Sequence, residues 1–330
     1  MASISPKLTI ITSCYSDERY QDLTELLDSL HGQTYKNMEA IIVIERSRAL
    51  KEKIKDYIDT KNYQDMRVIF NEGPWGISQA RNLAIQQSTG DIIAFIDDDA
   101  IAFSDWAEGI VETYKDDSVI SVTGPILPLW EDESMSWIPK EFYWIFSCTH
   151  WDTAKRSEVR NGYGANLSFH HQAFRDYGLL NTRFGVRGRG RKGWQEPGAE
   201  ETEFALRIRQ RSYKKIIYNP KVKVKHKVYR YRITMKFITR RAYWEGYAKA
   251  LLQYMYPRGK DKRNPMQTEW ALLYRILLRL LPHTLGSLFL KPVISLRRLQ
   301  LIAVVLSCVA VGYLRFKLIL LTNRRKLQGV

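Results

Sequence analysis

The sequence predicts an α/β protein whose mainly parallel β-sheet carries helices on its faces. Five short apolar runs follow one another in the first 125 residues, at 8–14, 39–44, 68–70, 92–96 and 119–123. Helical patterns separate these runs, and this alternation is typical of β–α–β units. The run at 92–96 is apolar at every position, as a strand buried on both faces of a parallel sheet requires.

Helices are expected between these strands. One helix carries leucines at spacings of three, four and seven residues: Leu23, Leu26, Leu27 and Leu30. Ser78 is expected to cap the helix that contains residues 80–84, and Ser104 to cap the helix after the fourth strand. Turn residues at 71–76 separate the third strand from its helix.

Charge is distributed unevenly along the 330 residues, whose formal net charge is +16. Residues 201–330 contain 29 Lys and Arg against 5 Asp and Glu, a net charge of +24, so the first 200 residues carry −8. A strongly basic half suits an anionic membrane, an anionic substrate or a nucleic acid.

The cysteines and the first residues indicate a compartment. Cys14, Cys148 and Cys308 form no disulfide framework or zinc spacing, which fits a reducing environment. Residues 1–6 lack the basic region of a secretory signal, so the site is expected to face the cytoplasm.

Three carboxylates, Asp97, Asp98 and Asp99, follow the buried run at 92–96. Ligands of open α/β sheets bind beyond the carboxyl ends of the strands. Alternation along an extended chain points Asp97 and Asp99 the same way, so the two could hold one divalent cation and, through it, a diphosphate. An acidic loop that caps the next helix is the alternative interpretation.

Two further acidic residues, Asp17 and Glu45, also follow strands and should lie at the same edge of the sheet. The sequence has neither a G-x-G-x-x-G segment after the first strand nor a Walker A loop. A nucleotide would therefore be held by carboxylates and a metal.

In this order, the motifs resemble those of the family 2 inverting glycosyltransferases, which have the GT-A fold and use nucleotide sugars. The first half supplies motifs at residues 15–18, 44–45, 80–82, 90–91 and 95–99. The second half supplies 164–169, 178–180, 198–207 and 218–220, and then His226. The resemblance covers residues 8–230, over two-thirds of the chain.

The resemblance implies roles for the acidic residues. Asp99 would bind Mn²⁺ or Mg²⁺, Asp97 would share the metal or hold the ribose, and His226 would be a further metal ligand. Asp98 is placed with them at the nucleotide-sugar site, and hydrogen bonding to nearby backbone is its alternative interpretation. A structural histidine is the alternative interpretation for His226.

The nucleotide sugar would have three further contacts. Asp17 and Glu45 would accept hydrogen bonds from uracil or ribose, and Arg81 would balance the diphosphate. Solvated loop ends explain the two acids equally well, and an i,i+4 partner on a helix surface would explain Arg81.

The resemblance also implies a catalytic base. Glu201 stands where the family more often has aspartate, so its reach is longer and Glu200 remains a second candidate. A carboxylate is needed because a sugar hydroxyl attacks poorly until its proton is removed. Glu203 should point elsewhere, and acidic residues also favour the first turn of any helix.

A basic glycine-rich loop at 187–194 precedes these glutamates. Its Arg187, Arg189, Arg191 and Trp194 would bind phosphate or an acidic sugar and close over the substrates. Such a loop would also suit RNA.

Residues 240–252 resemble a segment of the glucosyl-dolichyl-phosphate glucuronosyltransferase-like group, which acts on polyisoprenyl-linked sugars. Trp244 would then contact the acceptor. Of the Gln-x-x-Arg-Trp motif of processive synthases, only this tryptophan is present, which argues against a processive enzyme.

The C-terminal part is expected to associate with a membrane. Residues 270–290 are typical of an amphipathic surface helix. The 16 residues at 299–314 are free of charge but span only about 24 Å as a helix, short of a ~30 Å hydrocarbon core unless residues 316–321 contribute. An interfacial or re-entrant segment is therefore favoured, and a buried core helix is the alternative.

These observations predict two regions. A GT-A domain would cover 1–230, with a nucleotide-sugar half at 1–125 and an acceptor half at 126–230, and a basic helical membrane-associating region would cover 231–330. The predicted function is metal-dependent transfer of a sugar from a nucleotide, favouring uridine diphosphate, to a lipid-linked acceptor at the cytoplasmic membrane face. A soluble or polysaccharide acceptor, a basic RNA-binding protein and an inactive scaffold are the alternatives, and no nucleic acid partner is expected.

Overall fold

The structure is a computed structural model that describes residues 5–150, 154–185, 198–257 and 265–322. Its main sheet has eight strands in the order β3-β2-β1-β4-β9-β6-β10-β8. Neighbours β3, β2, β1 and β4 run parallel, and β9 is antiparallel to both strands beside it. The strands are β1 (Leu8–Cys14), β2 (Met38–Glu45), β3 (Met66–Asn71), β4 (Ile92–Phe95), β6 (Val119–Thr123), β8 (Ser157–Glu158), β9 (Leu167–His170) and β10 (Lys215–Tyr218).

Helices cover both faces of this sheet, so its central strands are apolar throughout. Leu8 and Ile10 of β1 pack in the hydrophobic cluster formed with α1 (Tyr20–His31), α2 (Arg48–Lys61) and α4 (Trp106–Thr113). Ile11 points to the other face, towards α3 (Ile77–Gln87), α5 (Gln172–Tyr177) and α6 (Glu200–Arg211). The predicted α/β fold is confirmed.

A second sheet of three strands lies beyond the carboxyl end of β4. It consists of β5 (Ala100–Ala102), β11 (Val224–Val228) and β7 (Ile126–Trp130), in that order. β11 runs antiparallel to β5, and His226 pairs with Ala100. This register brings His226 next to the acidic segment that links β4 to β5.

Two details of the sequence prediction are wrong. The short strand β5 was not expected, because three residues give no periodicity to detect. Neither predicted serine cap forms: Gly76 precedes α3, where Ser78 instead donates to the carbonyl of Phe184, and Asp105 precedes α4 in place of Ser104.

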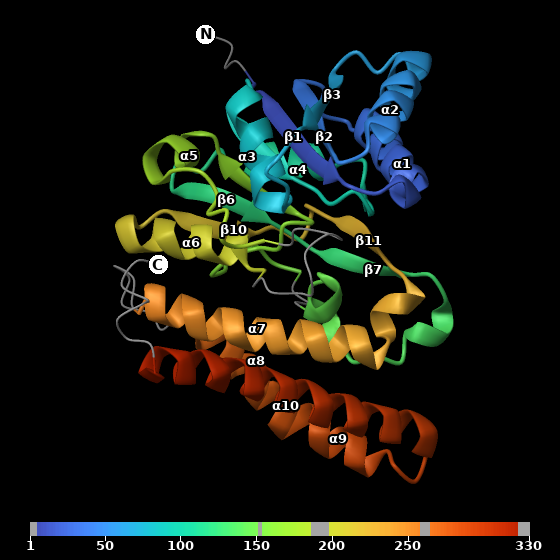
Figure 1. The fold of residues 1–330 in the computed structure, drawn as a ribbon, viewed down its shortest axis with the longest axis vertical. Helices are drawn as coiled ribbons and strands as arrows, with labels where there is room; N and C mark the ends of the chain where they lie inside the picture. The colour runs from blue at the N-terminus through green and yellow to red at the C-terminus, as the bar shows by residue number, and fades with distance from the viewer. Residues whose placement is uncertain (1–4, 151–153, 186–197, 258–264, 323–330) are drawn as a thin grey trace.

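The C-terminal helices form a layer of their own, with α7 between the sheets and α10 (Figure 1). The layer contains α7 (Met235–Met255), α8 (Gln267–Arg275), the π-helical turn η5 (Ile276–Leu280), α9 (Leu281–Gly286) and α10 (Pro292–Thr322). Shorter 3-10 turns are η1 (Asp17–Arg19), η2 (Glu133–Met135), η3 (Lys140–Phe146) and η4 (Arg230–Ile233). Leu301 and Val305 of α10 are buried in the same hydrophobic cluster as β1.

α10 is longer than the charge-free stretch of the sequence suggested. Its 31 residues continue through the flanking charges and span roughly 46 Å at 1.5 Å per residue, more than a hydrocarbon core of ~30 Å. Of the most apolar 18-residue stretch of α10, only 17% is buried. By length and composition it is the one helix in the described part of the chain that could cross a membrane.

The segment at 270–290, expected as one amphipathic helix, is divided by the π-helical turn η5. Pro282 follows this turn and has no N–H to donate to the carbonyl of Leu278, so the regular hydrogen-bond pattern cannot continue through it. Apolar side chains around the turn are exposed, among them Trp270, Leu278 and Phe289.

α7 and α10 meet at two glycines. A Cβ atom on Gly246 would lie 2.0 Å from the carbonyl oxygen of Val309, and one on Gly312 would lie 1.9 Å from that of Tyr243. Both distances are far below van der Waals contact, so each helix needs a glycine where the backbones cross. The C-terminal helix is thereby held against α7.

We expect Gly246→Ala to destabilise the protein by about 1–3 kcal/mol, because the added methyl group collides with backbone that cannot rotate away. Gly286→Ala is the matched control, since a Cβ there meets nothing within 4 Å. Thermal unfolding followed by tryptophan fluorescence should show a lower midpoint for the first variant only. Equal midpoints would contradict the close helix crossing.

Candidate active site

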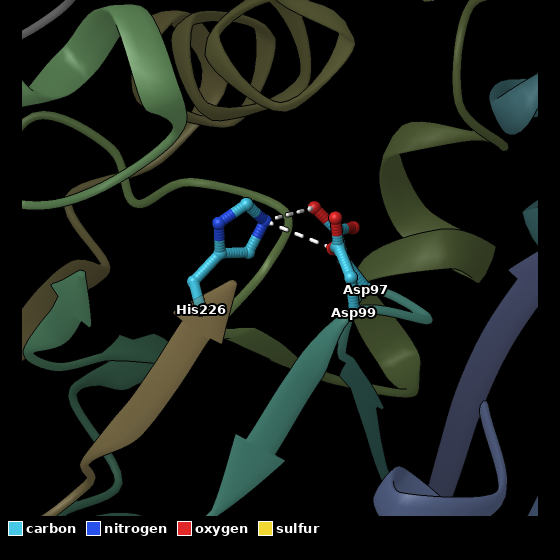
Figure 2. Close-up of side chains that lie close together, drawn as sticks. All are labelled: Asp97, Asp99 and His226. Carbon is cyan, nitrogen blue, oxygen red and sulfur yellow. Dashed lines mark ion pairs between the residues drawn. The ribbon is translucent and has the colours of Figure 1, made fainter. Parts of the chain in front are cut away.

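Asp97, Asp99 and His226 converge from two sheets at the carboxyl end of β4 (Figure 2). The His226 Nε2 atom lies 3.1 Å from Asp99 Oδ1 and 3.7 Å from Asp97 Oδ2. One ligand atom from each residue lies within 4.8 Å of the other two. Two carboxylate oxygens and one imidazole nitrogen are suitable ligands for Mn²⁺, so the residues fit the predicted metal site.

His226 is buried between these carboxylates. Burial alone would lower its pKa, but Asp99 and Asp97 outweigh that effect and raise the pKa well above its ordinary value. A metal and a proton compete for Nε2, because an imidazole must be neutral at the nitrogen that binds the metal.

Asp99 is held from its other side by two arginines that the sequence analysis did not identify. Its Oδ2 atom accepts from Arg19 Nη1 at 3.0 Å and from Arg232 Nη2 at 2.7 Å. Burial opposes ionisation of Asp99, yet His226, Arg232 and Arg19 together lower its pKa. Arg19 lies in η1 and Arg232 in η4, so only the tertiary fold brings them to one carboxylate.

Arg81 connects this acidic cluster to the predicted base. Its side chain is almost fully buried, and Nη2 lies 3.2 Å from Asp97 Oδ1. Its Nη1 atom lies 3.2 Å from Glu200 Oε1 and 3.4 Å from Glu201 Oε1. The alternative interpretation of Arg81 as a surface residue with an i,i+4 partner is therefore wrong. A direct contact between Arg81 and a diphosphate stays a prediction.

Glu200 and Glu201 occupy the first turn of α6, after Ala199 at a φ of 84° turns the chain into the helix. Burial, and Glu201 beside it, raise the pKa of Glu200 to about 8. Glu201 is more accessible, and its Oε1 accepts from the backbone N–H of Gly164 at 2.9 Å. Glu200 is the more deeply buried of the two side chains, so an acceptor hydroxyl would reach Glu201 more easily, which favours Glu201 as the base.

Glu203 points away from the cluster, as expected from its place on the helix. Its carboxylate pairs with Arg207 at 2.6 Å and accepts from the hydroxyl of Tyr256. It therefore joins α6 to the end of α7.

The two acids assigned to the nucleotide differ in their surroundings. Glu45 is buried, and its Oε1 accepts from Asn71 Nδ2 at 2.7 Å and from the N–H of Gly76 at 3.0 Å. It braces the turn before α3, so its interpretation as a solvated loop end is wrong. Asp17 is exposed and accepts from the hydroxyl of Ser47 at 3.0 Å. Their contacts with a base or ribose stay predictions.

The remaining predicted site residues are placed as follows. Asp98 lies beside Cys14, and burial together with Asp99 raises its pKa to about 7. Trp244 of α7 packs edge-on against Tyr243 and Tyr247. The basic-loop residues Arg187, Arg189, Arg191 and Trp194 lie outside the described residues.

One cavity of about 1890 Å³ joins these groups to the C-terminal helices. Asp97, His226 and Glu201 line one part of it. Trp244 of α7 and Leu306 of α10 line another. The carboxylates and imidazole at the sheet edge thus share a single space with side chains of the C-terminal helices.

Comparisons with known proteins agree with this geometry. The pattern of the family described as Glycosyl transferase family 2 matches residues 9–178, which include β4 and the acidic cluster. The chain belongs to glycosyl transferase family 2. It is therefore a glycosyltransferase, and its predicted family membership is confirmed.

Two curated relatives support this assignment. The chain is 32% identical over 310 residues to the glucosyl-dolichyl phosphate glucuronosyltransferase of Haloferax volcanii, covering 93% of this chain and 94% of that protein. It is 30% identical over 129 residues to the succinoglycan biosynthesis protein ExoM of Rhizobium meliloti, covering 39% and 37% of the two chains.

Solved structures share the fold. The mannosyltransferase PcManGT from Pyrobaculum calidifontis, in complex with GDP-Man and Mn²⁺, superposes with a TM-score of 0.63 at 19% identity, over 94% of this chain and 88% of that chain. GalNAc-T7 with UDP, GalNAc and Mn²⁺ gives a TM-score of 0.54 at 16% identity, over 75% and 50%. The predicted GT-A fold is confirmed.

We expect Arg81→Met to destabilise the glycosyltransferase by roughly 3–5 kcal/mol, because its removal leaves buried carboxylates without their cation. Arg48→Met is the control: Arg48 pairs with Glu72 at 2.7 Å, but both side chains are about 70% exposed. That surface pair should contribute at most ~1 kcal/mol. Urea unfolding of both variants measures the difference, and similar losses would show that Arg81 does not hold the cluster together.

The raised pKa of His226 predicts that Mn²⁺ binds more tightly at higher pH. Because binding displaces a proton from His226, the apparent Kd should fall between pH 6 and 8, by up to about tenfold per pH unit. Calorimetry in two buffers of different ionisation enthalpy measures the proton release directly. Glu201→Gln should keep this dependence and Asp99→Ala should abolish binding, whereas a pH-independent Kd in the unmodified protein would contradict the site.

Proposed function

We propose that this glycosyltransferase moves a sugar from a uridine diphosphate donor to a polyprenyl-phosphate-linked acceptor, with inversion, at the cytoplasmic face of the membrane. The observation that carries the proposal is Arg81, which joins Asp97 to Glu201, two residues that line a cavity also lined by α7, α8 and α10. Donor, base and a lipid-linked acceptor would then occupy one space.

The donor would bind at the carboxyl ends of β1, β2 and β4. Asp97, Asp99 and His226 would hold Mn²⁺ or Mg²⁺, which when bound would neutralise the diphosphate. Arg19 and Arg232 hold one oxygen of Asp99 and leave the other, Oδ1, facing His226. Two fold relatives are complexes with Mn²⁺ and a nucleotide or nucleotide sugar, which supports a metal-dependent donor site.

Glu201 would act as the base. It would remove the proton of the acceptor hydroxyl as that oxygen attacks the anomeric carbon, and the diphosphate would leave with the bonding electron pair. Attack from the face opposite the leaving group inverts the configuration. The Gly164 N–H and Arg81 orient Oε1 of Glu201, which leaves its second oxygen for the acceptor.

The relative from Haloferax volcanii supports the lipid-linked acceptor, since its name includes a dolichyl phosphate and its sequence aligns along nearly the whole chain. The helical layer supports a membrane location. α10 is long and apolar, and Phe289 and Leu290 beside it are 93% and 83% exposed. Arg297 and Arg298 in the first turns of α10 would favour anionic headgroups.

Release of nucleotide from uridine- and guanosine-linked sugars, with Mn²⁺, tests the proposal when measured with and without a polyprenyl-phosphate-linked sugar. We expect release from a uridine-linked donor to require the lipid acceptor. Glu201→Gln should lower kcat by about 10²–10⁴ while leaving Mn²⁺ binding intact. Transfer to a soluble sugar alone would reject the lipid acceptor, and full activity of Glu201→Gln would reject the base.

A further inference from the structure

A second group of charged side chains lines the same cavity, away from the metal site. It consists of Arg160, Arg241, Glu245, Lys249 and Glu269, which we term the α7–α8 charge cluster. Arg160 precedes β9, the next three residues belong to α7, and Glu269 belongs to α8. None of these side chains contacts Asp97, Asp99 or His226 through any ion pair that the described residues form.

Most members of this cluster are paired. Arg160 Nη1 lies 2.6 Å from Glu269 Oε2 and donates to the carbonyl of Pro265. Lys249 Nζ lies 3.0 Å from Glu245 Oε1 and 3.1 Å from Glu269 Oε1. These contacts fix two cations on the wall of the cavity.

Arg241 is held less tightly. The one ion pair that the described residues provide for it is to Glu245 Oε2, at 3.7 Å. Three cations face two carboxylates, so the cluster has an excess positive charge. The guanidinium of Arg241 can therefore turn towards an anion that enters the cavity, because this movement breaks no short hydrogen bond.

The cluster lies next to the predicted base. A Cβ atom on Gly198 would lie 3.2 Å from Arg241 Nη1, and Gly198 leads directly into the turn that carries Glu201. On the other side, Tyr163 is close enough to Glu245 and Arg160 for both charges to influence its pKa, which burial raises. The next residue, Gly164, donates its N–H to Glu201.

Another part of the cavity wall is apolar. Leu272, Leu273 and Ile276 face it from α8 and η5, and Leu306 and Val309 face it from α10. Leu272 and Leu273 lie one turn after Glu269 on α8, so the charge cluster adjoins this aliphatic wall as well as the turn that carries Glu201. A sugar joined through a phosphate to an isoprenoid chain has its hydroxyls, its charge and its apolar tail in the same order.

We infer that Arg241, with Lys249 and Arg160 beside it, binds the phosphate of the lipid-linked acceptor, and that the first isoprene units lie between α8 and α10. This inference rests on the lipid-linked acceptor proposed above and assigns residues to it. The α7–α8 charge cluster then fixes the acceptor at its phosphate, so the sugar beyond it reaches Glu201. Arg241 is a specificity-determining residue in this scheme.

Binding of farnesyl phosphate to the full chain in phosphatidylcholine nanodiscs tests this assignment. Trp244 and Trp270 line the cavity, so tryptophan fluorescence should report occupancy. We expect Arg241→Gln to weaken farnesyl phosphate at least tenfold, and Arg241→Lys to restore part of the affinity. Arg211→Gln removes an exposed arginine outside the cavity and should bind like the unmodified protein.

Two further ligands identify which part of the lipid is recognised. Farnesol lacks the phosphate, so it should bind the unmodified protein more weakly than farnesyl phosphate does. Its affinity should be the same for Arg241→Gln as for the unmodified protein, because the substitution removes only a contact with phosphate. Competition by phosphatidylglycerol equal to that of farnesyl phosphate would instead make the cluster a headgroup site and overturn the inference.

Donor binding separates failure of this inference from failure of the proposed function. Arg241→Gln should retain the Mn²⁺-dependent thermal shift produced by uridine diphosphate, which also shows that the variant is folded. If the unmodified enzyme transfers sugar to a lipid acceptor while Arg241→Gln keeps its KM, the function stands and the phosphate site is wrong. If the enzyme transfers only to soluble sugars, both are wrong.

Discussion

The arrangement of the site depends on one buried cation. Arg81 extends from α3 beneath the end of β4 and holds carboxylates that belong to two separate parts of the chain, Asp97 and the pair Glu200 and Glu201. Three acids this close together would repel one another in a medium of low polarity. The guanidinium offsets that repulsion, and its planar set of donors also fixes the directions of the carboxylates. Arg81 therefore both balances the charge of these carboxylates and fixes their orientation.

The edge of the sheet supplies the rest of the site. Parallel strands all end on the same side, so Asp17, Glu45, Asp97 and Asp99 lie at one edge of the sheet although Asp17 and Asp99 are 82 positions apart in the chain. The small second sheet adds His226 from a distant part of the sequence through its pairing with β5. The strand register thus places His226 Nε2 at hydrogen-bonding distance from Asp99, 3.1 Å from its Oδ1 atom. A one-residue slip of β11 would turn His226 to the opposite face.

Much of this could be predicted from the sequence, because local patterns specify it. Apolar runs predict the central strands, and the carboxylates after β4 predict the edge of the sheet at which Asp97, Asp99 and His226 converge. The arginines around Asp99 could not be found, since Arg19 and Arg232 lie more than 200 residues apart and neither belongs to a pattern. The sequence predicts Arg81 at the site, but its partners depend on how α6 packs against α3. The shortest elements were missed for a related reason: β5 and the caps of α3 and α4 are determined by tertiary contacts more than by the three or four residues that form them.

The glycine crossing of α7 and α10 has a consequence for where catalysis would occur. α7 supplies one wall of the cavity, and its backbone touches α10 without intervening side chains at Gly246 and Gly312. A helix pair joined in this way has little freedom to slide or rotate. If α10 enters a bilayer, the proposed reaction centre would lie at a fixed height above the headgroups, because α7 connects it rigidly to α10. The reach of an acceptor from the lipid surface to Glu201 would then be a dimension built into the protein, and acceptors with much longer or shorter head regions would be excluded by distance alone.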